Sequence, residues 1–260
     1  MSKSRACMLA GVAILALAAV PLIAQQAPPP PVVPQSNDEA VPKVPVGFSP
    51  IFNGKDLSGW HVSKTNHHGT TPSYQVIHGI LVGTQQPFGQ GGVLLTDKKY
   101  GEVEVYMEVK PDWGCDSGLF FWTDEDGGGY QVLLDYLPGG TMVAGMYGER
   151  LKDVNFNGAA WDAMAPADRQ ELQAKRNEAW QKVWKRDEWN TVRARIEGNP
   201  PRVTTWLNDV MLFQGRDTAN HATAGATTGS IAIQVHGGER WRPGAFWRWR
   251  VIAVKELTGK

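Results

Sequence analysis

The chain has 260 residues and a formal net charge of zero at pH 7, since 26 basic residues stand against 26 acidic ones. This balance argues against a nucleic-acid partner, because contacts to phosphates need a basic surface. Tryptophan is frequent, with 11 residues. Buried tryptophans fill a core, whereas exposed ones stack on the apolar faces of sugar rings. The sequence leaves both interpretations open for Trp122, Trp206, Trp241, Trp247 and Trp249.

The first 24 residues have the order of an export signal. Lys3 and Arg5 give a positive start, an apolar run covers residues 10–20, and the small residue Ala24 ends the segment. The apolar run is shorter than the roughly 20 residues of a membrane span, so we predict a cleaved signal, with an uncleaved anchor as the alternative. The expected location is the periplasm or the outside of the cell, without further membrane contact.

Residues 25–46 are rich in proline and are predicted to form a disordered linker. This leaves residues 47–260 as a single domain of ordinary size. Cys115 is the one cysteine after the signal, which excludes an internal disulfide there. It is expected to be a small core or loop residue, with a nucleophile as the alternative.

Alternation of apolar and polar side chains predicts strands through most of this domain. Residues 102–110 show it best, with one apolar face and one charged face expected in water. A hairpin is predicted over 74–82, turning at His78-Gly79. Further strands are predicted over 118–122, 130–136, 191–197, 202–208, 230–236 and 248–257. Short strands joined by glycine-rich turns favour an all-β sandwich or barrel.

Residues 166–185 break this pattern with a helical period. Pro166 suits a first helical position, and Glu171–Lys175 and Glu178–Lys182 are pairs in the favourable order. The apolar side chains on one side are Leu172, Ala179, Trp180, Val183 and Trp184. We predict one amphipathic helix over the sandwich, either as a wall of a cleft or as a structural covering.

Strand parity selects polar side chains that could carry chemistry. Gln234 and His236 share one face of their strand, which is either part of a site or an ordinary solvated face. Asp135 is the one acid in an apolar strand, and is either structurally paired or catalytic. Asp116, at the start of the preceding strand, is a further candidate or an Asx-turn residue.

Sugar hydrolysis uses an acid and a base or nucleophile. Asp116, Asp135 and Glu149 could supply these groups, with His236 as a proton shuttle. There is no glycine-rich phosphate loop, zinc-type Cys/His spacing or nucleophile elbow. No cofactor is firmly implied, and a divalent cation held by carboxylates is left open.

Ordered motifs then resemble a known family. Residues 48–60, FSPIFNGKDLSGW, resemble the "LFNGKDLxGW" start of the 3-keto-disaccharide hydrolase family. In the same order, residues 116–118 resemble "NSG", 129–135 loosely "YExQxxD", 188–190 "EWN", 206–209 "WLNG", 233–237 "LQxHG" and 249–257 "FRNIxIKEL". The resemblance covers residues 47–257.

The resemblance implies a concanavalin A-like jelly-roll sandwich of two antiparallel sheets, with a cleft on the concave face. It also implies cleavage of the glycosidic bond of 3-keto sugars, so carbohydrate is the expected partner. Because a 3-keto group acidifies the neighbouring C2 proton, elimination followed by hydration is open beside hydrolysis.

This chain departs from the family at two positions. Asp116 stands where the family has Asn, and the strand Glu of the family is replaced by Gln131 or Tyr130, depending on the register. Neither side chain can replace a carboxylate as acid or base. An exchange of carboxylate and amide between positions 116 and 131 would compensate if the two are neighbours.

The predicted site therefore has catalytic and substrate-binding members. Asp135, His236 and Asp116 are the predicted catalytic residues. The predicted substrate-binding residues are Gln131, Gln234, Arg250, Trp122 and Tyr130. A carbohydrate-binding module without turnover and a structural protein of the cell envelope are the alternatives, and the oligomeric state is left open.

Overall fold

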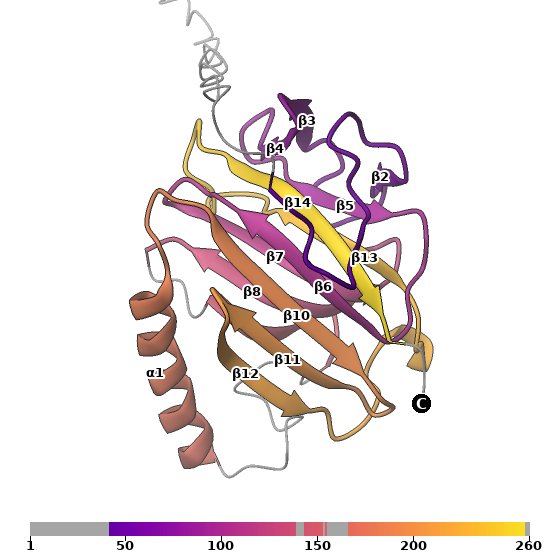
Figure 1. Cartoon of the computed structure of the whole chain (residues 1–260), viewed down its shortest axis with the longest axis vertical. Helices are drawn as coiled ribbons and strands as arrows, with labels where there is room; N and C mark the ends of the chain where they lie inside the picture. Colours follow the sequence, from indigo (N-terminus) through magenta and orange to yellow (C-terminus); the bar gives the residue numbers. More distant parts are fainter. Residues whose placement is uncertain (1–41, 139–142, 153, 155–165, 258–260) are drawn as a thin grey trace, which may run out of the picture.

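The computed structural model describes residues 42–138, 143–152, 154 and 166–257. These residues form two antiparallel β-sheets packed face to face, with one α-helix beside them (Figure 1). The predicted all-β sandwich with an inserted helix is confirmed. The predicted signal and most of the predicted linker lie outside the described residues.

The larger sheet has eight strands in the order β12-β11-β10-β6-β14-β4-β3, with β1 also paired to β14. Their bounds are Ser49–Pro50 (β1), Ser73–Ile77 (β3), Ile80–Thr84 (β4), Val103–Val109 (β6), Asn190–Glu197 (β10), Arg202–Leu207 (β11), Val210–Arg216 (β12) and Trp247–Glu256 (β14). The predicted hairpin with its turn at His78-Gly79 is the β3–β4 pair.

The smaller sheet has six strands in the order β2-β5-β13-β7-β8-β9. Their bounds are Trp60–Val62 (β2), Gly92–Thr96 (β5), Cys115–Thr123 (β7), Gly129–Tyr136 (β8), Val143–Glu149 (β9) and Ser230–Val235 (β13). Because side chains alternate along a strand, one face of this sheet packs on the core and the other carries the polar candidates.

The core lies between the two sheets. From β6 it takes the side chains of Val103, Val105, Met107 and Val109, which are fully buried as expected. Tryptophans also fill it: Trp122, Trp241, Trp247 and Trp249 are all at most 2% exposed. Trp206 is half-buried on the larger sheet, with the Arg193 guanidinium 3.9 Å from the centre of its ring. Of the five tryptophans for which the sequence allowed either burial or exposure, four are therefore buried.

The second face of β6 is not wet as expected. Glu104 and Glu108 are buried there beneath arginines from neighbouring strands. Glu104 pairs with Arg193 at 2.9 Å and with Arg195 at 2.5 Å, and Glu108 pairs with Arg250 at 2.5 Å. Long arginine stems cover these carboxylates, so a period-two pattern does not mean exposure on the polar face.

The helix α1 runs over Pro166–Val183 and contacts β9 and β12 (Figure 1). Trp180 is buried, and Ala179, Val183 and Trp184 pack against the core, which confirms the predicted apolar side. The helix is therefore a covering of the sandwich edge. A short 3₁₀ turn, Thr223–Gly225, is the other helical element of the described residues. Within the described residues, no helix has the length and apolar character of a membrane span.

Candidate functional site

Two buried carboxylates form the centre of the candidate site on the outer face of the smaller sheet. Asp116 on β7 lies directly opposite Asp135 on β8, and both are less than 5% exposed. The Arg240 guanidinium bridges them, with Nε 2.5 Å from Oδ2 of Asp116 and the Nη2 atom 3.2 Å from Oδ2 of Asp135. Two acids thus share one cation.

Backbone bonds place Arg240 over this pair. The N–H of Asp116 donates to the carbonyl oxygen of Arg240 at 3.0 Å, and the next residues, Cys115 and Trp241, form an isolated bridge. The bend before Arg240 is held by Gln85, whose Nε2 donates to the carbonyl oxygens of His236 at 2.6 Å and Gly238 at 2.9 Å. The backbone of Arg240 is therefore fixed in position, although its side chain is partly exposed.

The surroundings of Asp116 favour its protonated form. Burial raises the pKa of Asp116 well above its usual value, and the hydrogen bond with Asp135 and its negative charge raise it further, while Arg240 opposes the shift. Like-charged carboxylates in contact cannot both ionise easily, so the proton belongs to the pair. The raised pKa favours a neutral Asp116, which could donate a hydrogen bond.

His236 lies beside this pair, with Nε2 3.7 Å from Oδ2 of Asp116. Its Nδ1 donates to the carbonyl oxygen of Gly237 at 2.7 Å. Because a carbonyl oxygen only accepts, the proton is on Nδ1 and the lone pair is on Nε2 in the neutral ring. Burial lowers the pKa of His236, which favours this neutral form. The ring is therefore a base next to a protonated acid.

Two amides continue the polar face. Gln131 on β8 donates from Nε2 to Oε1 of Gln234 on β13 at 3.2 Å, across the intervening strand β7. Gly118 of β7 leaves the space for this contact, since a Cβ atom there would lie 2.4 Å from Nε2 of Gln131. Tyr147 on β9 is the cross-strand partner of Gln131 and is 39% exposed.

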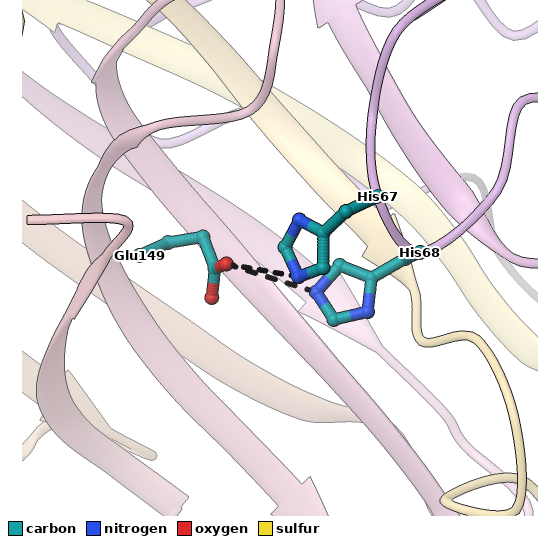
Figure 2. A group of neighbouring side chains, drawn as sticks. All are labelled: His67, His68 and Glu149. Carbon is teal, nitrogen blue, oxygen red and sulfur yellow. Dashed lines mark ion pairs between the residues drawn. The ribbon is translucent and has the colours of Figure 1, made fainter.

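Two histidines and a glutamate lie next to His236. His67 and His68 lie in the loop between β2 and β3, and Glu149 ends β9; their side chains point toward one another (Figure 2). Oε1 of Glu149 is 3.3 Å from Nε2 of His67 and 3.9 Å from Nε2 of His68. The His68 and His236 rings are 4.2 Å apart between centres. Among the described residues, these three form the one group of His, Cys, Asp or Glu side chains whose donor atoms lie close enough together to hold a metal ion.

The profile of the 3-keto-alpha-glucoside-1,2-lyase-like domain family matches residues 47–255. The chain belongs to this family. No curated protein matches it. The family resemblance found in the sequence is thus confirmed.

Solved structures support the family's fold. A protein from Parabacteroides distasonis, named as a putative glycosyl hydrolase, is 16% identical with a TM-score of 0.50, over 81% of this chain and 99% of the other. A protein of unknown function with a galectin-like fold from Bacillus subtilis is 10% identical with a TM-score of 0.54, over 83% and 97%. The predicted jelly-roll sandwich is confirmed at the level of the fold.

Five of the eight predicted site residues of this family member share one face. These are Asp116, Gln131, Asp135, Gln234 and His236. The proposed exchange between positions 116 and 131 is not supported, because Gln131 is paired with Phe120 and Asp116 with Asp135. Both positions belong to the same face, but they are not cross-strand neighbours.

The structure places the other three predicted residues away from this face. Trp122 has a φ of 51°, which turns its side chain from the outer face into the core, where its indole N–H donates to Gly101 at 2.9 Å. The Tyr130 hydroxyl, on the core side of β8, donates to Asp217 at 2.7 Å. Arg250 belongs to β14 of the larger sheet and pairs with Glu108. These three side chains therefore do not lie on the face that carries the other five predicted residues.

Sequence reasoning did not select Arg240, His67 or His68. Arg240 follows the Gly237-Gly238 bend, and the His67-His68 pair precedes Gly69, so each lies in a loop without period. The pair of adjacent histidines was the one feature of the sequence that could have pointed to these loop residues. Cys115 is fully buried, and burial raises the pKa of its thiol to about 12, so it is a core residue rather than a nucleophile.

Proposed function

We propose that the protein cleaves the glycosidic bond of 3-keto glycosides by elimination across C1 and C2. His236 is the base and Asp116 the hydrogen-bond donor in this proposal. The supporting observation is the Asp116–Asp135 pair beneath Arg240, with Nε2 of His236 3.7 Å from Oδ2 of Asp116. Burial raises the pKa of Asp116, which favours its protonated form. Membership of the 3-keto-alpha-glucoside-1,2-lyase-like family supports the substrate class.

The reaction begins at C2, whose proton is acidic because the C3 carbonyl stabilises the resulting carbanion as an enolate. Nε2 of His236 takes this proton. In this proposal the proton of Asp116 turns from Asp135 to the keto oxygen, where negative charge develops. The enolate electrons then form the C1–C2 double bond as the C1–O bond breaks. The leaving oxygen takes the proton now held by Nε2 of His236 and departs as an alcohol, which returns His236 to its neutral form. Water can add across the double bond afterwards.

This role accounts for the departure of the chain from the family at position 116. The family motif has Asn there, and an amide is a neutral hydrogen-bond donor. An ionised Asp cannot donate, but a protonated Asp can. Burial and the charge of Asp135 keep the proton on Asp116, so Asp135 is a positioning residue and Arg240 balances the remaining charge.

Gln131, Gln234 and Tyr147 are the proposed substrate-binding residues. The two amides lie side by side on the outer face and are at most 3% exposed, so they are proposed to form the floor of the sugar site beneath the more exposed Tyr147. The exposed ring of Tyr147 continues this face and can stack on the apolar side of a sugar ring. Trp122 and Trp249, which are buried, have no such surface.

Turnover of a chromogenic 3-keto-glucoside by three variants tests this proposal. We expect His236→Ala to lower kcat by about 100-fold or more, the usual effect of losing a general base. Asp116→Leu should lower kcat by a similar factor because a donor to the keto oxygen is lost. Asp116→Asn restores the family residue and keeps a neutral hydrogen-bond donor. Its kcat should therefore stay within about tenfold of the wild type at neutral pH, a change of up to about 1.4 kcal/mol in the barrier.

A carbohydrate-binding module without turnover is the second candidate function. The family's strand Glu is absent, with Gln131 or Tyr130 in its place. If that Glu is indispensable, the outer face binds a sugar through Gln131 and Gln234 and does not cleave it. Binding of the 3-keto-glucoside without product, in a folded wild-type protein, would favour this function over the enzyme.

A further inference from the structure

The cluster of His67, His68 and Glu149 has the geometry of a metal site. Its donor atoms come from two separate segments and all lie within 4.8 Å of one another. Two ligands bound about 2.0–2.2 Å from a tetrahedral zinc ion are separated by about 3.4 Å. The Glu149–His67 and Glu149–His68 separations of 3.3 and 3.9 Å are close to this value.

His68 carries a buried nitrogen that points into the cluster. Its side chain is 10% exposed, and Nε2 has no hydrogen-bond partner among the described residues. The 3.9 Å separation from Glu149 is too long for a hydrogen bond. Buried polar atoms are normally satisfied, so an unsatisfied imidazole nitrogen facing a carboxylate indicates a missing partner between them.

The charges of the cluster also favour a cation. Glu149 is nearly buried, with a side chain 12% exposed. Its carboxyl lies against one nitrogen of each imidazole ring, 3.3 Å from His67 and 3.9 Å from His68. Two neutral imidazoles and one carboxylate are ligands typical of zinc and related divalent ions.

The backbone holds the histidines in place. His68 donates its N–H to Oδ1 of Asn66 at 3.0 Å, and its carbonyl oxygen accepts from the N–H of Gly91 at 2.8 Å. Gly237 lies so close that a Cβ atom there would be 2.2 Å from this carbonyl oxygen. Ligands fixed by their own backbone lose little freedom when an ion binds, as a preorganised site requires.

We propose that His67, His68 and Glu149 bind one divalent transition-metal ion of the zinc class. Three protein ligands leave a fourth coordination position for an oxygen ligand, as in catalytic rather than structural zinc sites. Because His68 packs against His236, the ion lies next to the proposed base. A sugar hydroxyl or keto oxygen is the expected fourth ligand, a step that rests on the proposed function, whereas metal binding itself does not.

The test is metal binding by the full chain after chelator treatment and dialysis. Calorimetric titration with zinc chloride, and with calcium chloride for comparison, should give one zinc ion per chain and weaker calcium binding. His68→Ala and the isosteric Glu149→Gln should each weaken zinc binding by at least about tenfold, the usual range for altered metal sites. Absence of zinc binding by the wild type would overturn the proposal.

His61→Ala is the matched control. His61 also contacts two acids, Asp97 at 2.6 Å and Glu125 at 3.0 Å, but from opposite nitrogens of its ring, so the three do not converge. We expect zinc binding by this variant to equal that of the wild type. Circular dichroism checks that each variant is folded. Equal binding by His68→Ala, Glu149→Gln and the wild type would show a different or adventitious site and overturn the assignment.

Cobalt separates the metal proposal from the enzyme proposal. Cobalt bound to these ligands should give visible absorption bands that His68→Ala lacks, with no substrate present. Adding the 3-keto-glucoside should change these bands if a sugar oxygen is the fourth ligand. Unchanged bands with substrate bound would overturn the sugar-ligand step alone. Metal binding without turnover would contradict the proposed function and leave the metal site standing.

Discussion

At the scale of single residues, neighbours rather than residue type decide what Asp116 does. An exposed Asp is ionised at neutral pH, but Asp116 is buried against Asp135, which raises its pKa and favours the protonated form. This makes it a chemical equivalent of the family's Asn. Departures from a family motif therefore need to be judged by protonation state as well as by residue name.

The pH dependence of stability tests this protonation. Because the pKa of Asp116 is raised in the folded state, the folded protein keeps a proton that the unfolded chain has lost above about pH 4. Its contribution to the free energy of unfolding therefore falls as pH rises toward the folded pKa. Asp116→Asn removes this effect, so the variant should gain relative to the wild type by up to about 1.4 kcal/mol per pH unit in urea unfolding.

Asp56→Asn is the control of opposite sign. Hydrogen bonds from Asn53 and Ser58 lower the pKa of Asp56 to about 2. Its contribution is present above about pH 4 and is lost as pH falls toward 2. The Asp56 variant should therefore be less stable than the wild type above about pH 4, and this difference should shrink as the pH falls toward 2. A difference between Asp116→Asn and the wild type that does not change with pH would contradict a protonated Asp116.

The predicted site residues that share one face of the structure lie on strands of the smaller sheet or directly after one. Parity grouped Gln234 with His236, and Gln131 with Asp135, because side chains alternate across a sheet. Trp122 was predicted to bind substrate, but its positive φ turns its side chain into the core. Arg240, His67 and His68 could not be predicted in this way, since loop residues are placed by tertiary contacts and not by a period.

At the scale of elements, loops crossing the smaller sheet bring the site together. The N–H of Ser63 donates to Val93 on β5, and Nδ2 of Asn66 donates to the carbonyl oxygen of Asp126 in the β7–β8 loop. The loop from β2 is thus tied down on both sides before it reaches His67 and His68. The site consists of strand residues completed by loop residues.

The same loops explain which strands were missed. β5 is buried on both faces, because the loop after β2 covers its outer side, so its sequence GVLLT shows no alternation. β9 contains a bulge opposite Val132–Leu134, which interrupts its period. Strands with one core face and one polar face, such as β6 and β10, were predicted with bounds close to the observed ones.

Gly237→Ala tests the contact between the loop and the bend after β13. A Cβ atom there would lie 2.2 Å from the carbonyl oxygen of His68, which is backbone and cannot move aside alone. We expect a loss of about 2 kcal/mol in the free energy of unfolding, within the usual range for overpacking, together with lowered turnover.

Gly101→Ala is the control for this substitution. Its Cβ atom would meet Thr228 at 3.6 Å, which is ordinary van der Waals contact. We expect a change within about 0.5 kcal/mol, as for most tolerated surface substitutions. Equal stability of the two variants in urea unfolding would show that the loop and the bend are not in tight contact.

At the scale of the whole molecule, the sandwich is a scaffold, and we propose that one of its outer faces carries the chemistry. The two outer faces differ in kind. The larger sheet carries arginine–glutamate pairs that satisfy one another, such as Arg250 with Glu108. The smaller sheet carries two acids that share one arginine beside a neutral histidine. Excess acid over base in a buried setting is typical of functional sites.

Export is proposed from the first 24 residues. We expect the signal to be removed after Ala24, which leaves a chain that begins with Gln25 and has 24 basic against 26 acidic residues, since Lys3 and Arg5 are lost. Mass spectrometry of the protein from the periplasm or the medium of the expressing cells checks the new N-terminus. A protein found with residues 1–24 intact in the membrane fraction would support the anchor instead.

The central claim is that this face removes the C2 proton of a 3-keto sugar, and NMR of the products in D₂O tests it most directly. The proposal predicts either the unsaturated sugar or, after hydration, a 3-keto sugar with deuterium at C2, formed faster than without enzyme and not by His236→Ala. A released 3-keto sugar that keeps its C2 proton would contradict elimination and show direct hydrolysis.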